Sequence, residues 1–182
     1  MNKKHLVLHH DDRSTDFLKP IYAHLSSKTV VHYSVDVDVR ALIRSHERVI
    51  MLGHGYPGGL FYMIDESHAG LLRQKKDNIY IWCHADQYVK KHGLSGMTTG
   101  MFISETSEAL CYGIGVKVCA RGAVERSNDL FARLVAEKIT ADLPALHEHV
   151  MEGYQIQACP IIEYNRERLQ LIEATAPQAT LS

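Results

Sequence analysis

A histidine and a cysteine each follow an apolar stretch of the chain, and the two residue types together could carry out nucleophilic chemistry. His54 comes after the apolar residues 49–52 and a glycine, and Cys83 directly follows residues 79–82. The thiolate, not the thiol, is the strong nucleophile, and a free cysteine has a pKa of about 8.5. Histidine, with an ordinary pKa of about 6.5, can act as the base at neutral pH. We therefore expect His54 to lower the pKa of the Cys83 thiol, provided that the fold brings the two together.

Three glycines follow this histidine and leave little side-chain bulk beside it. Gly55 would let a substrate carbonyl approach the bare backbone, where an N–H group can stabilise a developing oxyanion. Gly58 and Gly59 continue the same segment and would leave room for an extended substrate. We expect these three glycines to form an oxyanion and substrate-binding segment next to His54.

Short apolar segments alternate with amphipathic ones, and this pattern predicts how the two side chains are positioned. We expect strands at residues 6–8, 29–33, 49–52, 79–82 and 101–103, with short helices between them. Strands that alternate with helices over short connections are typical of βαβ units and of a mostly parallel sheet. Open parallel sheets bind ligands beyond the carboxyl ends of their strands. Residues 9–12, His54 and residues 83–86 should therefore share one edge.

The second half of the chain is richer in helix. An apolar stripe spans residues 130–139, a second helix should begin at Asp142, and residues 116–119 could add a sixth strand. The predicted fold class is an α/β protein, a three-layer α/β/α sandwich with a mostly parallel sheet of five or six strands. We expect a single domain over residues 1–173, followed by a loose tail at 174–182.

At the two blocks around His54 and Cys83 the sequence resembles the caspase-like cysteine peptidases, which include caspases, metacaspases, gingipains, separase and CHAT-domain proteins. Residues 49–55 match the apolar strand that ends in His-Gly, and residues 79–83 match the apolar strand that ends in the catalytic cysteine. Trp82 departs from the pattern, because the family usually has Ala or Gly there. The resemblance implies a caspase-like fold, with Cys83 as nucleophile, His54 as base and Gly55 as an oxyanion donor. It also implies a peptide or protein substrate, and Asp86 and Glu105 could then recognise a basic residue.

Composition excludes several other classes. The 182 residues carry a formal net charge of −1, which gives no electrostatic reason to expect nucleic acid or an acidic membrane surface as a partner. The apolar run near the amino terminus is too short for a signal peptide or a spanning helix, and the four cysteines are irregularly spaced. A cytoplasmic location is therefore expected. Without a phosphate loop of the type G-x-x-x-x-G-K-[ST], no cofactor is expected.

Two alternatives stay open at the level of the sequence. A metal-dependent hydrolase could use His10, Asp11, His54 and His84, whose side chains are metal-ligand types, although they match no known ligand spacing and we assign no metal site. A non-catalytic sensor or binding module could keep the caspase-like fold without turnover. Neither the oligomeric state nor the cleavage specificity follows from the sequence.

Overall fold

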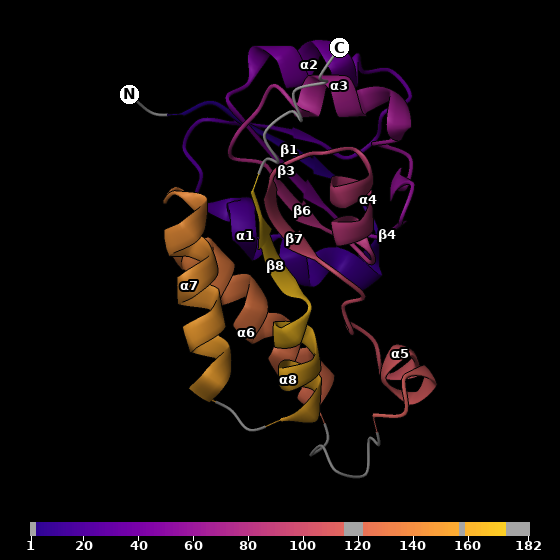
Figure 1. Cartoon of the computed structure of the whole chain (residues 1–182), viewed down its shortest axis with the longest axis vertical. Coiled ribbons are helices and arrows are strands. Elements are labelled where there is room, and N and C mark those ends of the chain that lie inside the picture. Colours follow the sequence, from indigo (N-terminus) through magenta and orange to yellow (C-terminus); the bar gives the residue numbers. More distant parts are fainter. Residues whose placement is uncertain (1–2, 115–121, 157–158, 174–182) are drawn as a thin grey trace, which may run out of the picture.

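The centre of the fold is a six-stranded β-sheet, seen in a computed structural model that describes residues 3–114, 122–156 and 159–173 (Figure 1). The strand order across the sheet is β2-β1-β3-β6-β7-β8. The first five of these run parallel to one another, and β8 runs antiparallel to β7. The strands are β1 (His5–His9), β2 (Lys28–Val31), β3 (Arg48–Leu52), β6 (Ile79–Ile81), β7 (Gly96–Thr99) and β8 (Leu169–Ile172). The expectation of an α/β fold with a mostly parallel sheet is confirmed.

Helices cover both faces of this sheet (Figure 1). One face packs against α2 (Val39–Ser45), α3 (Ala69–Leu72) and α4 (Ala85–Lys91). The opposite face packs against α1 (Pro20–Ala23), α6 (Ala123–Lys138) and α7 (Leu143–Gly153). The remaining elements are the 3₁₀ turns η1 (Arg13–Leu18), η2 (Glu66–His68) and η3 (Tyr154–Ile156), the short strands β4 (Gly55–Tyr56) and β5 (Gly59–Leu60), and the helices α5 (Thr106–Cys111) and α8 (Pro160–Glu167).

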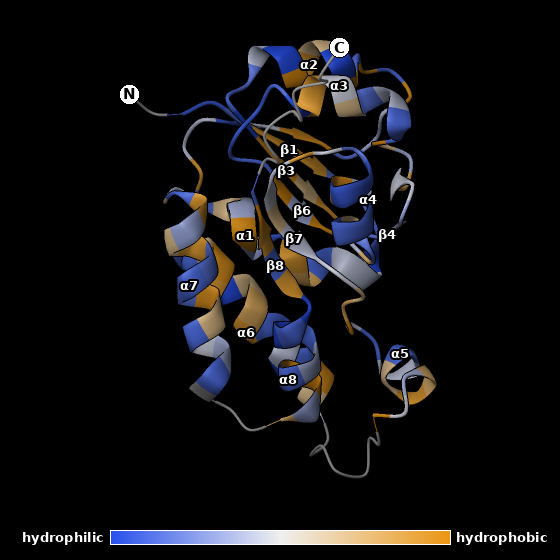
Figure 2. Cartoon of the chain, in the orientation of Figure 1, coloured by the Kyte–Doolittle hydropathy of each residue, from blue (hydrophilic) through white to orange (hydrophobic). Residues whose placement is uncertain are grey.

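The central strands are apolar on both sides because both faces are covered. In β1, Leu6 and Leu8 belong to the core beneath α2, α3 and α4, whereas Val7 belongs to the core beneath α6 and α7. Successive side chains of a strand point to opposite faces, so a strand between two helical layers reads as a continuous apolar run. Figure 2 shows this directly, with hydrophobic colouring along the central strands and mixed colouring on the helices around them.

The fifth strand does not lie where the sequence analysis placed it. Residues 101–103 form a loop, and the strand is β7, which ends just before them. An apolar residue is needed at position 102 because Phe102 packs in the core against Phe131, with ring centroids 4.8 Å apart. The backbone of Ile103 is paired by a side chain instead of a strand, since Asn165 accepts from its N–H (2.7 Å) and donates to its carbonyl (2.9 Å). Burial alone therefore accounts for this apolar triplet.

The edge strand of the sheet comes from a part of the sequence in which no strand was expected. β8 pairs with β7 along its whole length, from Gly96 opposite Ile172 to Thr99 opposite Leu169. The helices α5 and α8 were not predicted either. The expected strand at 116–119 and the whole of the expected tail at 174–182 lie outside the described residues.

His9, the last residue of β1, is buried, and both nitrogens of its imidazole ring form hydrogen bonds. Its Nε2 lies 3.1 Å from Thr15 Oγ1, and its Nδ1 lies 2.9 Å from the hydroxyl of Tyr22. Thr15 donates its own hydroxyl proton to the carbonyl of Asp12, so its oxygen accepts from His9. Nδ1 is then the acceptor for Tyr22, and the ring is neutral. Burial, the largest cause, lowers the pKa of His9 to about 4.

We expect this histidine to make the fold acid-labile. The unfolded chain takes up a proton at about pH 6.5, the folded chain only at about pH 4, so the unfolded state binds more protons between these values. The free energy of unfolding should therefore fall as the pH is lowered through this window, by roughly 3 kcal/mol in total. Urea denaturation from pH 7.5 to 4.5 measures the slope. His9→Gln should flatten it, the exposed His24→Gln should not, and equal slopes in all three proteins would contradict the prediction.

Candidate active site

The two strands that precede His54 and Cys83 are neighbours in the sheet. β3 and β6 pair in parallel, with Leu52 opposite Ile81, so both end at the same edge, called here the carboxyl edge. His54 and Cys83 each lie two residues beyond the end of their strand and line one small cavity of about 20 Å³. Its other lining residues are Thr15, Phe17, Leu18, Gly53, Ile81, Trp82, Phe102 and Ser104. The structure thus brings the two principal candidate residues to one place.

Cys83 lies at a bend that is held by the neighbouring strand. The side chain of Thr99 donates to the carbonyl of Trp82 (2.8 Å) and accepts from the N–H of the same residue (3.1 Å). One residue beyond Cys83, the N–H of His84 donates to the carbonyl of Gly100 (3.1 Å). His84 has a φ of 66°, in the left-handed region, and the chain turns there into α4. These bonds fix the backbone on both sides of the cysteine.

The surroundings of the Cys83 thiol favour its protonated form. Burial raises the pKa of Cys83, and the charge of Glu108 acts in the same direction. The sulfur donates to the carbonyl of Phe102 at 3.7 Å. The net shift is upward because removal from water disfavours the thiolate, and the expectation that His54 lowers the pKa of this thiol stays a prediction.

His54 has a different polar partner. Its Nε2 lies 2.6 Å from Ser14 Oγ, and Ser14 Oγ donates to Asp12 Oδ1 at 2.7 Å. Asp12 also accepts from the N–H of Ser14 (2.9 Å) and so caps η1. Asp12 was expected at this edge, within residues 9–12, but not as part of a hydrogen-bond chain to His54, and Ser14 was not predicted to be a site residue. The available signal was the spacing Asp-x-Ser directly after a buried strand, which is typical of a helix cap at the carboxyl edge.

Gly55, Gly58 and Gly59 belong to the hairpin of β4 and β5, where packing requires the absence of a side chain at Gly55 and Gly59. A Cβ atom on Gly55 would lie 2.3 Å from the Trp82 ring, and one on Gly59 would lie 2.0 Å from the carbonyl oxygen of Ile64. A Cβ atom on Gly58 would lie 2.5 Å from the ring of Tyr56. These contacts are a structural reason for the glycines that is independent of any substrate.

The spacing of Gly53, Gly55 and Gly58 also matches the pattern G-x-G-x-x-G of dinucleotide-binding proteins. That pattern requires a helix directly after the glycines, whose amino terminus holds the pyrophosphate. Here the segment enters the antiparallel hairpin of β4 and β5, and Gly55 pairs with Leu60. The segment is therefore a hairpin and not a nucleotide-binding loop.

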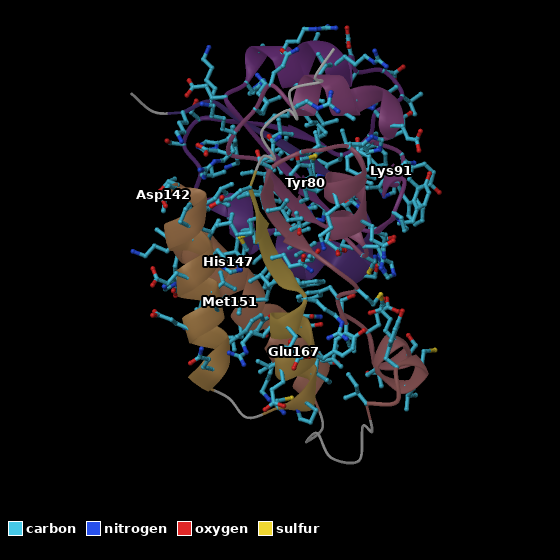
Figure 3. All side chains as sticks on the ribbon, viewed as in Figure 1. Tyr80, Lys91, Asp142, His147, Met151 and Glu167 are labelled. Atoms are coloured by element: carbon cyan, nitrogen blue, oxygen red, sulfur yellow. The ribbon has the colours of Figure 1, made fainter. Side chains whose placement is uncertain are left out.

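Trp82 faces the side of the sheet opposite to α6 and α7. Its ring packs edge-on against Tyr80, which is labelled in Figure 3, and against Tyr88, with centroids 5.7 Å apart in both cases. Its indole N–H donates to the carbonyl of Tyr56 at 3.2 Å. Where the caspase-like pattern has a small residue, this chain uses a large ring that supports the hairpin after His54.

The two carboxylates considered for substrate recognition have other partners. Asp86 lies in the first turn of α4 and forms an ion pair with Lys90 at 3.2 Å. Glu105 is exposed at the start of α5, where its backbone N–H donates to Glu108 Oε2 (3.0 Å) and its carboxylate accepts from the Ser107 hydroxyl (3.3 Å). Among the described residues that line the cavity, neither carboxylate is present. A role in recognising a basic residue would require a substrate that extends well beyond the cavity.

The residues of the metal alternative are likewise separated. His10 stacks with Tyr62, with centroids 5.0 Å apart, and Asp11 accepts from the hydroxyl of Tyr33 (3.2 Å). His84 lies 3.2 Å from the amide of Gln87. Within residues 3–114, 122–156 and 159–173, no three or more His, Cys, Asp or Glu side chains are grouped so that they could hold a metal ion.

Comparison with known proteins adds no family to this picture: no protein-family model matches the sequence, and no curated protein is significantly similar to it. In the part of the chain that the structure describes, no helix has both the length and the apolar character needed to cross a membrane.

Proposed function

We propose that the chain is a cysteine-dependent amide hydrolase of the caspase-like type, with a peptide or protein as its substrate. The observation that supports this proposal is the position of His54 and Cys83, which follow neighbouring parallel strands and line one cavity. The two sequence blocks that carry the caspase-like resemblance are the segments that end at these positions. A base and a thiol from adjacent strand ends are an arrangement suited to acyl transfer.

The chemistry would follow the general course of thiol catalysis. His54 takes the proton of the Cys83 thiol, and the thiolate lone pair attacks the carbonyl carbon of the scissile amide. The C–N bond then breaks as the imidazolium returns its proton to the leaving amine. Water, deprotonated by the same imidazole, hydrolyses the thioester and restores the free thiol.

The cavity must widen before this reaction can occur. Its volume of about 20 Å³ suits one water molecule and not a peptide. The rings of Phe17 and Phe102 both line it and stack with centroids 6.5 Å apart. A substrate would have to displace such side chains, and the reaction requires the thiol and the imidazole to come within hydrogen-bond reach in the bound state.

A second candidate function is a binding or sensor module without turnover. The small volume of the cavity and the raised pKa of the Cys83 thiol favour it, because both disfavour attack by the thiolate on a substrate. The two functions differ in whether a substrate-like ligand activates the thiol.

Alkylation distinguishes them. With iodoacetamide near pH 7.4, we expect the exposed Cys111 to be labelled on the order of tenfold faster than Cys83, whose thiol is half-buried and has a raised pKa. A peptidyl acyloxymethyl ketone with Arg, Lys or Asp next to the reactive group should instead label Cys83, because bound peptide opens the cavity. Peptide mapping by mass spectrometry locates each adduct.

His54→Ala should abolish labelling of Cys83 by the peptidyl reagent and leave the iodoacetamide reaction of Cys111 unchanged. If the peptidyl reagents modify Cys111 and Cys83 equally, or modify neither, the hydrolase proposal fails and the binding module is favoured.

A further inference from the structure

A chain of hydrogen bonds connects His54 to a carboxylate that lies forty-two positions earlier in the sequence. The distance from His54 Nε2 to Ser14 Oγ is 2.6 Å, and that from Ser14 Oγ to Asp12 Oδ1 is 2.7 Å. All three residues follow strand ends at the carboxyl edge, since η1 begins four residues after β1. His54 therefore has an ordered partner on the ring nitrogen Nε2.

The direction of each proton follows from the groups involved. Ser14 has a single hydroxyl proton, and an ionised carboxylate can only accept. The two hydrogen bonds from Ser14 hold the pKa of the Asp12 carboxyl below its usual range, so Asp12 is ionised at neutral pH. The hydroxyl proton of Ser14 thus points to Asp12, and Ser14 Oγ must accept from Nε2–H of His54. Nδ1 is then the ring nitrogen that remains free to take up a proton.

We propose that Ser14 and Asp12 are positioning residues that hold His54 in the Nε2–H tautomer, with Nδ1 as the base for Cys83. This inference rests on the proposed function. When the thiol proton moves to Nδ1, the products are a thiolate and an imidazolium. The positive ring then faces, through Nε2–H, a hydroxyl whose proton is directed at a carboxylate, and both groups stabilise that charge.

The turn that carries Ser14 is anchored in the core. Thr15, the next residue, donates to the carbonyl of Asp12 at 2.9 Å and lies 3.1 Å from the ring of the buried His9. Side chains that orient a catalytic group work best when their own positions are fixed by further contacts. The Asp12–Ser14 turn meets this condition through β1.

The same geometry separates Ser14 from a nucleophilic serine. A serine nucleophile gives its proton to the histidine, and the acid of such a triad binds the other nitrogen of the ring. In this chain the carboxylate binds the serine itself and keeps the hydroxyl proton away from His54. Ser14 is therefore placed to orient the base and not to attack the substrate.

The chain contains a matched control for this turn. Asp65 and Ser67 have the same Asp-x-Ser spacing, and Asp65 Oδ1 accepts from the N–H of Ser67 (2.9 Å) and from its hydroxyl. This second turn caps η2, and its hydrogen bonds do not involve His54. Ser67→Ala removes the same local hydrogen bond without touching the candidate active site.

The test uses the full chain with ¹⁵N-labelled histidine, the His54 signals being assigned with His54→Ala. In the wild type, we expect His54 to be in the Nε2–H tautomer at neutral pH. Ser14→Ala should give a mixture of the two tautomers, and Asp12→Asn should shift the population in the same direction. Ser14→Thr, which keeps the hydroxyl, should restore the wild-type state, and Ser67→Ala should leave it unchanged.

In peptide hydrolysis, Ser14→Ala should lower kcat on the order of 10- to 100-fold with little change in KM, and Ser14→Thr should recover most of this loss. An unchanged tautomer in Ser14→Ala would overturn the proposal, as would a loss as complete as that of Cys83→Ala. If the wild type hydrolyses no peptide, the proposed function fails, and the tautomer measurement still decides whether Ser14 and Asp12 position His54.

Discussion

Replacing Cys83 by alanine should abolish peptide hydrolysis, because Cys83 is the thiol that shares its cavity with His54. Removing the base with His54→Ala should lower kcat by a factor on the order of 10³ or more. The double variant should be no slower than Cys83→Ala alone, since residues that act as one unit have effects that do not add. Short peptides with Arg, Lys or Asp before a fluorogenic group provide the measurement.

The control for these variants is Cys111→Ala, which removes an exposed thiol on α5 and should leave the rate unchanged. A chelator should have no effect either, because the proposed mechanism uses no metal. Activity that survives in Cys83→Ala but is lost with a chelator would transfer the function to a metal-dependent hydrolase. Activity that disappears equally in Cys111→Ala would show that the assigned nucleophile is wrong.

The strands that could be predicted from the sequence are those buried on both faces, because such strands consist of consecutive apolar residues. Residues 49–52 and 79–82 are such runs, and β3 and β6 lie there. The position of β7 was predicted wrongly because its residues, Gly96 to Thr99, include polar side chains. In a sequence such residues are typical of a loop, although here these side chains are buried. β8 was not predicted because the residues with which it pairs are seventy or more positions away, and pairing over that distance leaves no local pattern.

Only the part of the candidate site that directly follows predicted strands could be identified from the sequence. His54 and Cys83 follow apolar runs, so the carboxyl-edge rule identified them. Ser14 was not predicted to belong to the site, since its contact with His54 depends on how η1 folds back over the edge. The raised pKa of the thiol depends on its burial in the folded protein, and no local sequence pattern encodes that packing.

A different large effect is expected at the opposite end of β3. Arg48 is fully buried, and its guanidinium donates to the carbonyls of Ile139 and Ala141, the latter at 2.7 Å. It also lies 3.5 Å from Asp77. The two carbonyls follow the last residue of α6, where a helix leaves its final C=O groups without partners. Asp142, labelled in Figure 3, begins the next helix directly afterwards, so one arginine ties the turn between α6 and α7 to the sheet.

Arg48→Met should therefore lower the free energy of unfolding by about 3 kcal/mol, because methionine fills a similar volume but leaves buried carbonyls without donors. Replacing both members of a buried polar pair by apolar groups can be neutral, but here one member is the backbone and stays. Urea denaturation measures the loss. Arg44→Met, on the exposed side of α2, is the matched control and should change stability by no more than about 0.5 kcal/mol.

The loss of stability in Arg48→Lys should fall between those of the two methionine variants, since an ammonium keeps the charge but cannot present the planar fork that reaches both carbonyls. A loss in Arg48→Met no larger than that in Arg44→Met would mean that the turn is held by the apolar packing of α6 and α7 and not by the guanidinium.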